Sequence, residues 1–144
     1  MQIRKGKISD FKELMEILNS TPQLQDSKDG KSYSRKWVEA SIKDEKDNFI
    51  LIAEERGRLA GFLLSEVWRN KNFSEMVDLY VKPEFRKMGV ATMLVKRYEK
   101  NCRKYHLNSI SALVLASNKR MQKFMKKNGY KKGNIFYFYG KQMR

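Results

Sequence analysis

The chain has 144 residues, one cysteine, one histidine and a formal net charge of +15. This length suits a single domain spanning residues 1–144, with a core of its own. One cysteine excludes an internal disulfide and a cysteine-based metal cluster, and Cys102 falls on an apolar helical stripe, which predicts a buried, unreactive thiol. No apolar run has membrane-spanning length and no secretory signal is recognisable, so a cytoplasmic location is expected.

The positive charge is confined to one end of the sequence. Residues 1–85 contain 15 basic and 15 acidic side chains, whereas residues 86–144 contain 16 basic residues and only one acidic residue, Glu99. A positive half would steer a polyanionic ligand towards itself. Two other interpretations stay open, namely solvated helix faces that only confer solubility and an acidic macromolecular partner.

Hydrophobic patterning predicts strands that meander in the first half of the chain and alternate with helices in the second half. In chain order the pattern predicts a strand at 2–7, helices from about 10 and over 34–42, strands at 49–54, 59–67 and 73–81, a helix at 92–105, a strand at 110–116, a helix at 119–127 and an aromatic strand at 135–139. This order is typical of a mixed α/β sheet.

The six residues Arg86-Lys87-Met88-Gly89-Val90-Ala91 join a predicted strand to a long predicted helix. Gly89 lets the backbone approach a ligand closely. The helix that follows begins with unpaired N–H groups and the positive end of its dipole, which together form an anion site. Strand, turn and helix therefore predict a cradle for a pyrophosphate.

Two segments resemble the signatures of a known family. The run from Asp78 to Leu94, which contains Arg86 to Ala91, resembles the acetyl-CoA motif of the GCN5-related N-acetyltransferases (GNAT). Downstream, Ser117-Asn118-Lys119-Arg120-Met121 followed by Phe124 to Tyr130 resembles that family's second signature, in which an Asn opens a helix that closes with Gly and an aromatic residue.

The resemblance implies the GNAT fold, a single-domain mixed sheet flanked by helices. Its central strands, ending near Val81 and Ala116, would splay apart around the pantetheine arm of acetyl-CoA. A backbone N–H near Val81 would polarise the thioester carbonyl, and N–H groups from Lys87 to Thr92 would hold the pyrophosphate. The expected acetyl-CoA residues are Leu79, Tyr80, Val81, Arg86, Lys87, Met88, Gly89, Val90, Ala91, Thr92 and Asn118. No metal site is expected.

The resemblance also indicates catalytic candidates. Glu75, six residues before Val81, matches a glutamate of histone-type members and is the expected base, with Asp78 as its rival. Both also have an ordinary structural interpretation, as a hairpin and a bulge residue. Met125 occupies the position where many members place a proton-donating tyrosine, and methionine cannot donate. Tyr80, Tyr130, Tyr137, Tyr139 or solvent would have to protonate the thiolate.

The expected function is acetyl-CoA-dependent acetyl transfer to a primary amine of a small molecule or peptide. Residues 1–85 would form the acceptor side, with Tyr33, Trp37 and Trp68 near its rim, and residues 86–144 the cofactor side. The alternative is a basic acetyltransferase-like module that binds RNA or a ribosome, or senses acyl-CoA, with little catalysis. Nucleic acid is the less favoured partner because the basic residues lack interleaved aromatic residues. A homodimer through the aromatic strand is an analogy with the family only.

Overall fold

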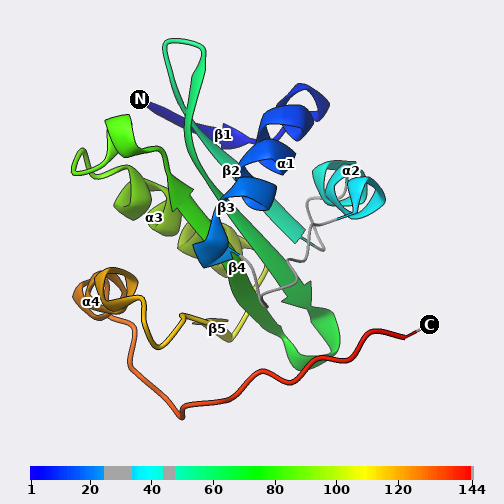
Figure 1. Cartoon of the computed structure of the whole chain (residues 1–144), viewed down its shortest axis with the longest axis vertical. Helices are drawn as coiled ribbons and strands as arrows, with labels where there is room; N and C mark the ends of the chain where they lie inside the picture. Colours follow the sequence, from blue (N-terminus) through cyan, green and yellow to red (C-terminus); the bar gives the residue numbers. More distant parts are fainter. Residues whose placement is uncertain (25–33, 44–47, 144) are drawn as a thin grey trace. The chain divides into compact units, whose positions relative to one another are not determined.

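A computed structural model describes residues 1–24, 34–43 and 48–143. The chain divides into two compact units. The first comprises residues 1–11 and 34–113, and the second comprises residues 12–33 and 114–144. Figure 1 follows the chain through both.

The first unit contains a five-stranded sheet with the strand order β1-β2-β3-β4-β5. Its strands are β1 (Gln2–Lys5), β2 (Asn48–Glu55), β3 (Arg58–Trp68), β4 (Phe73–Val81) and β5 (Ser109–Ala112). Neighbours from β1 to β4 are antiparallel and β5 runs parallel to β4, so the sheet is mixed as predicted. A tight turn through Arg56 and Gly57, both with positive φ, joins β2 to β3, as hairpin geometry favours.

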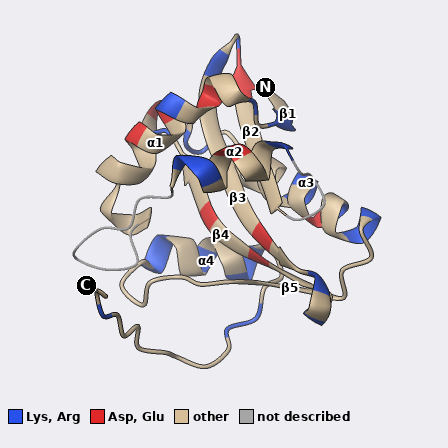
Figure 2. Cartoon of the chain, turned by 90° about the vertical axis from the view of Figure 1, so that its right-hand side faces the viewer, with Lys and Arg blue, Asp and Glu red and all other residues tan. Residues whose placement is uncertain are grey.

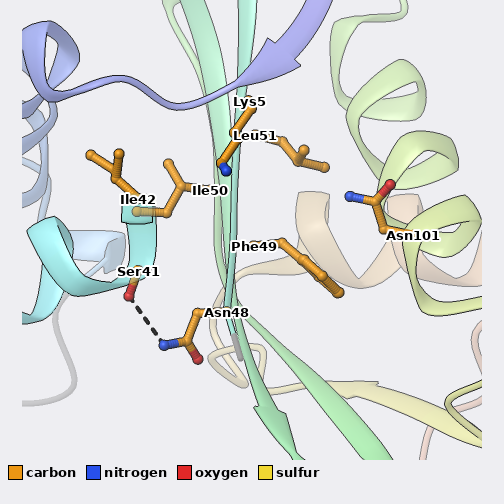
Figure 3. Close-up of a pocket in the computed structure, with 8 residues that line it drawn as sticks. All are labelled: Lys5, Ser41, Ile42, Asn48, Phe49, Ile50, Leu51 and Asn101. Carbon is orange, nitrogen blue, oxygen red and sulfur yellow. Dashed lines mark hydrogen bonds between the residues drawn. The ribbon is translucent and has the colours of Figure 1, made fainter. Parts of the chain in front are cut away.

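Two helices cover opposite faces of this sheet. Helix α2 (Arg35–Lys43) contacts β2, and helix α3 (Val90–Lys104) contacts β1 to β4. Figure 3 shows Ile50 on the side of α2, and Phe49 and Leu51 on the side of α3. The Asn48 side-chain amide donates to Ser41 Oγ on α2 at 3.1 Å. We call the two sides the α2 face and the α3 face.

Aromatic side chains fix α3 to its face of the sheet. The Phe49 ring lies edge-on to Tyr98 at 6.1 Å and stacks on Tyr105 at 5.7 Å. Tyr98 is fully buried and donates its hydroxyl proton to Ser74 Oγ on β4 at 2.8 Å. Buried Tyr needs such a partner, and this bond ties α3 to β4.

Cys102 is buried in α3, as the apolar stripe predicts. Burial raises the pKa of its thiol to about 11. Because the thiolate is the reactive form, this thiol is unreactive near neutral pH.

The second unit contains two α-helices among its described residues, α1 (Phe11–Ser20), which begins one residue before the unit, and α4 (Lys119–Lys127). Helix α1 buries Leu14 and Leu18, four residues apart on one side. Helix α4 has the predicted bounds. Short 3₁₀ turns complete the described secondary structure of the chain: η1 (Ile8–Asp10), η2 (Pro22–Leu24), η3 (Arg69–Lys71) and η4 (Pro83–Phe85).

The predicted strand at 135–139 is wrong. Residues 131–143 contain no helix or strand, and the side chains of Ile135 to Tyr139 are 59–91% exposed. Alternating aromatic residues favour a strand, but a strand also needs a neighbour to take its backbone hydrogen bonds, and none pairs with this segment among the described residues. The predicted strand at 110–116 is also shorter, since β5 ends at Ala112.

In the described part of the chain, no helix is both long and apolar enough to cross a membrane.

Candidate functional site

Strand β4 contains a β-bulge in its middle. On β3, Leu64 pairs with Asp78 and the next residue, Ser65, pairs with Met76, so Val77 is an extra residue. An extra residue shifts the pleat by one position and turns the strand. Pairing with β5 ends at the same place, with Met76 opposite Ala112, although β4 continues to Val81. Among the described residues, the last five of β4 therefore have a neighbouring strand on the β3 side only.

Backbone N–H groups project from this open edge. The Lys82 N–H donates to the Ala60 carbonyl on β3 at 2.9 Å. Because N–H groups point alternately to the two sides of a strand, those of Leu79 and Val81 point away from β3. The Arg86 guanidinium lies on that same edge, where Nε donates to the Val81 carbonyl at 3.0 Å. The edge thus offers two donors that the sheet does not use.

The loop after β4 turns through two left-handed positions before α3 begins. Lys87 has φ 62° and Gly89, the N-cap of α3, has φ 77°. A Cβ on Gly89 would meet nothing within 4 Å, so the space beside Gly89 itself is open. The first N–H that bonds within α3 belongs to Met93, which donates to the Gly89 carbonyl at 3.0 Å. The preceding N–H groups, from Gly89 to Thr92, have no partner within the helix.

No acidic residue lies in the first turn of α3, and no side chain caps it. The positive end of this 15-residue helix is therefore not neutralised by any side chain of its own first turn. The nearest acidic side chain in sequence is Glu84, which faces Arg58 at 3.4 Å. This geometry suits a phosphate group, as the sequence predicts.

The bulge also brings two carboxylates to one face of the sheet. Glu75 and Asp78 are three residues apart, so a regular strand would place them on opposite faces. The extra residue Val77 restores them to the same face, which is the α2 face, because Asp78 pairs with Leu64, and Ile50 of β2 pairs with Leu64 in turn. Asp78 is buried, at 7% exposure, and Glu75 is half-buried.

A third carboxylate on this face escaped the sequence analysis. Glu66 on β3 pairs directly with Glu75. Two like charges opposite each other are unfavourable, so this pair concentrates negative charge on the α2 face. The sequence could have indicated this pair. Trp68 and Phe73 pair on either side of the turn at 69–72, and counting two residues back along β3 and two forward along β4 leads to Glu66 and Glu75. Figure 2 shows the acidic positions on β3 and β4.

Comparison with known proteins identifies the family of this chain. A family model described as "Acetyltransferase (GNAT) family" matches residues 11–130. The chain belongs to the acetyltransferase (GNAT) family. A search of curated proteins finds no match.

Solved GNAT structures share the fold. The apo aminoglycoside 6'-N-acetyltransferase AAC(6')-IG from Acinetobacter haemolyticus is 17% identical, with a TM-score of 0.75 and 100% of both chains covered. AAC(6')-Iy, in complex with a bisubstrate analogue made of CoA and acetylneamine, is 15% identical, with a TM-score of 0.75 and 99% and 98% coverage. The PaiA N-acetyltransferase from Thermoplasma acidophilum, bound to coenzyme A, is 24% identical, with a TM-score of 0.72 and 94% and 92% coverage. The expected family and fold are confirmed, and the chain is a member of a family of N-acetyltransferases.

The second GNAT signature has the predicted local structure. Asn118 is the N-cap of α4, and its side-chain oxygen accepts the Met121 N–H at 3.1 Å. Met125, at the family's tyrosine position, is the one buried residue of α4. A tyrosine at this buried position would have to bury its hydroxyl as well.

The acceptor rim that the sequence predicts is only partly described. Residues 25–33, including Tyr33, lie outside the described residues. Trp37 is half-buried on α2, and Trp68 is 43% exposed with Lys71 Nζ 5.8 Å from its ring centroid. In the described ranges, no group of three or more His, Cys, Asp or Glu side chains is placed to hold a metal ion.

Gly61 holds the end of β4 in position, and replacing it with alanine is expected to disturb the site. A Cβ at Gly61 would lie 2.5 Å from the Tyr80 carbonyl oxygen and 3.2 Å from Val81 Cα, so the backbone that carries the open-edge donors must move. We expect Gly61→Ala to lower the free energy of unfolding by about 1–3 kcal/mol. Denaturant unfolding measures this loss.

Gly6→Ala is the matched control, because its Cβ would crowd the buried side chain of Ile50 on β2, at 2.6 Å from Cγ2 and 3.2 Å from Cβ, and not the backbone of β4. We expect both variants to lose stability, and only Gly61→Ala to weaken acetyl-CoA binding as well. Unchanged acetyl-CoA binding in Gly61→Ala would contradict the view that Gly61 is required by the β4 backbone at the site.

Proposed function

We propose that this protein transfers the acetyl group of acetyl-CoA directly to a primary amine of a small molecule or peptide. The observation that carries the proposal is the juxtaposition, within the first unit, of the bulged open edge of β4 with an uncapped helix N-terminus only eight residues later, at Gly89. One supplies donors for a carbonyl and the other supplies donors for phosphate.

Each half of this arrangement has a role in the proposal. Acetyl-CoA supplies the acetyl group as a thioester. N–H groups from Gly89 to Thr92 hold its pyrophosphate, with Arg86 and Lys87 adding positive charge. The Val81 N–H, pointing from the open edge, polarises the thioester carbonyl and stabilises the oxyanion that develops there. Leu79, Tyr80 and Met88 line the path between these points, and Asn118 contributes as the family's Asn.

The acceptor amine must lose a proton before it can attack. A primary ammonium has a pKa of about 10.4, so a base is needed near neutral pH. Glu75 is the proposed base and Asp78 its rival, both on the α2 face of β4. The negative charge that Glu66, Glu75 and Asp78 place on this face supports a positively charged acceptor.

The departing thiolate is protonated without the family's usual tyrosine, because Met125 has no proton to give. Tyr80 is the best substitute in the first unit: it is half-exposed and its ring stacks on Phe62 at 5.5 Å, which fixes its orientation on the α2 face. Tyr130, Tyr137 and Tyr139 lie in the second unit, and the last two are 85% and 91% exposed. A thiol pKa of about 8.5 also permits protonation by solvent.

The test is turnover of acetyl-CoA, followed as free coenzyme A thiol, with a panel of polyamines, amino acids, aminoglycosides and short peptides. We expect turnover with one class of cationic amine. Acetyl-CoA binding without turnover on any class would favour the alternative, a sensor or docking module with little catalysis. Absence of acetyl-CoA binding by calorimetry would overturn the proposal itself.

A cytoplasmic location, where acetyl-CoA is available to the enzyme, belongs to the same proposal. A homodimer does too, because the exposed aromatic segment Ile135 to Tyr139 offers an apolar surface of the kind that interfaces cover. Sedimentation of the full chain, compared with a chain ending at Asn134, tests the dimer.

A further inference from the structure

Helix α3 carries a stripe of five cations on its outer side, which we call the α3 stripe. At 100° per residue, the spacing i, i+1, i+4, i+7, i+8 places them within about 120° of arc. The opposite side of the helix buries Leu94, Val95, Tyr98 and Cys102. All five cations are exposed: Lys96, Arg97, Lys100, Arg103 and Lys104.

Helix α4 repeats this spacing 23 residues later, forming the α4 stripe. Its cations are again all exposed: Lys119, Arg120, Lys123, Lys126 and Lys127. Met125, the buried residue of α4, points to the other side. Figure 2 shows basic residues along both helices.

Almost nothing in the described part of the chain neutralises these ten cations. Arg103 approaches Glu99 at 3.7 Å, and Lys104 lies over the Tyr105 ring at 5.2 Å. No acidic residue follows Glu99 in the sequence. One coenzyme A needs only a few positive charges, and its predicted cradle is at the other end of α3, so acetyl-CoA binding does not account for the stripes.

We propose that each stripe, taken by itself, is a docking surface for the phosphate backbone of a double-helical nucleic acid, independent of base sequence. Each stripe is a row of cations in which residues i, i+4 and i+8 advance about 6 Å per step along the helix. Such rows complement a regular line of phosphates, and neutralising phosphates drives sequence-independent binding by releasing counterions.

The composition of the stripes favours a duplex over other polyanions. Neither helix exposes an aromatic side chain beside its cations, since Tyr98 of α3 is buried and Phe124 of α4 is half-buried, and single strands are bound by stacking bases on aromatic rings. Helices that bind membranes insert their apolar side into lipid, whereas the apolar side of α3 is packed on the sheet. A folded acidic protein would present isolated carboxylates instead of a continuous line of charge.

The test is a salt titration of binding, by fluorescence anisotropy, to labelled RNA and DNA duplexes of random sequence, with the full chain saturated with acetyl-CoA. We expect a Kd of about 10⁻⁴–10⁻⁶ M near physiological salt, and five contacts of one stripe contribute about −4 to −5 to the slope of log K against log salt. The RNA and DNA arms show which duplex is preferred.

Two variants remove one stripe each. Replacing Lys96, Arg97, Lys100, Arg103 and Lys104 with Gln, or the five α4 cations with Gln, is expected to flatten the slope and weaken binding at least tenfold at low salt. The triple variant Lys96→Gln/Lys100→Gln/Lys104→Gln serves if a fivefold variant fails to fold. The matched control removes five scattered exposed cations instead: Lys12, Lys36, Lys43, Arg56 and Lys71.

The control is expected to keep most of the slope. The proposal is overturned if the control loses as much affinity as a stripe variant, or if the wild-type chain does not bind duplexes. It is equally overturned if a single strand, a polyglutamate peptide or an anionic phospholipid vesicle binds more tightly than the duplexes do.

Discussion

Replacing Gly89 with valine is expected to raise the Kd for acetyl-CoA about 100-fold, because a charge-assisted hydrogen bond contributes about 1.5–3 kcal/mol and two or more of them would be lost. Gly89 has φ 77° and open space where a side chain would stand. A branched side chain there would occupy the space above the N–H groups from Gly89 to Thr92 and would strain the turn. Isothermal calorimetry with acetyl-CoA measures the effect.

Gly57→Val is the matched control for backbone strain. Gly57 has φ 74° and nothing within 4 Å of its Cβ position, as at Gly89, but it lies in the turn between β2 and β3. Both variants should lose similar thermal stability, and only Gly89→Val should lose acetyl-CoA affinity. If the two variants bind acetyl-CoA equally well, the loop before α3 is not the pyrophosphate site.

Replacing Glu75 with Gln is expected to lower kcat by about 100-fold or more, the usual contribution of a general base, with the KM for acetyl-CoA unchanged. The rise of the rate with pH that reports deprotonation of the base should disappear as well. Asp78→Asn should lower kcat less and cost more stability, because Asp78 is buried and Glu75 is only half-buried. Steady-state kinetics over a pH range, together with thermal unfolding, separate these effects.

Glu66→Gln is the control on the same face. Glu66 pairs with Glu75, so its removal should raise the KM for a cationic acceptor and leave kcat largely intact. If instead Asp78→Asn abolishes turnover while Glu75→Gln keeps it, Asp78 is the base. Full activity in both variants would exclude either carboxylate from proton transfer.

Hydrophobic periodicity was sufficient to predict most elements, because each has a buried face. The helix over 119–127 and the strand over 73–81 have the predicted bounds, and α3 begins at Val90, two residues before the predicted start. Local signals determine where the two helices begin: Asn118 caps α4, and Gly89 supplies the left-handed turn before α3.

The sequence analysis allows a bulge residue at Asp78 as an ordinary structural interpretation, but only the strand register shows that the extra residue is Val77. Residues Phe73 to Val81 do not alternate strictly, since Met76 and Val77 are both apolar, and the position of a bulge depends on how β3 and β5 pair with the strand. Without the bulge, Glu75 and Asp78 would be assigned to opposite faces and would not be compared as alternatives for one role on geometric grounds. The family resemblance proposed both, but the shared face comes from the register alone.

For the aromatic segment Ile135 to Tyr139, the sequence instead predicts a strand that the structure does not contain. The segment's aromatic residues favour a strand, yet among the described residues no strand pairs with it and its side chains are exposed. Strand formation depends on an available edge, and a single sequence does not say which edge that is.

The environment of Cys102 also determines how cleanly this enzyme can be assayed. Thiol-trapping dyes detect released coenzyme A, and any reactive protein thiol adds a background that grows with enzyme concentration. Cys102 is the chain's one cysteine, and burial keeps the pKa of its thiol near 11. The folded enzyme should therefore react very little with such dyes. The absorbance change would then measure released coenzyme A alone, even at the high enzyme concentrations needed for a slowly acetylated acceptor. A rise in the background without acceptor would indicate that the enzyme is unfolding.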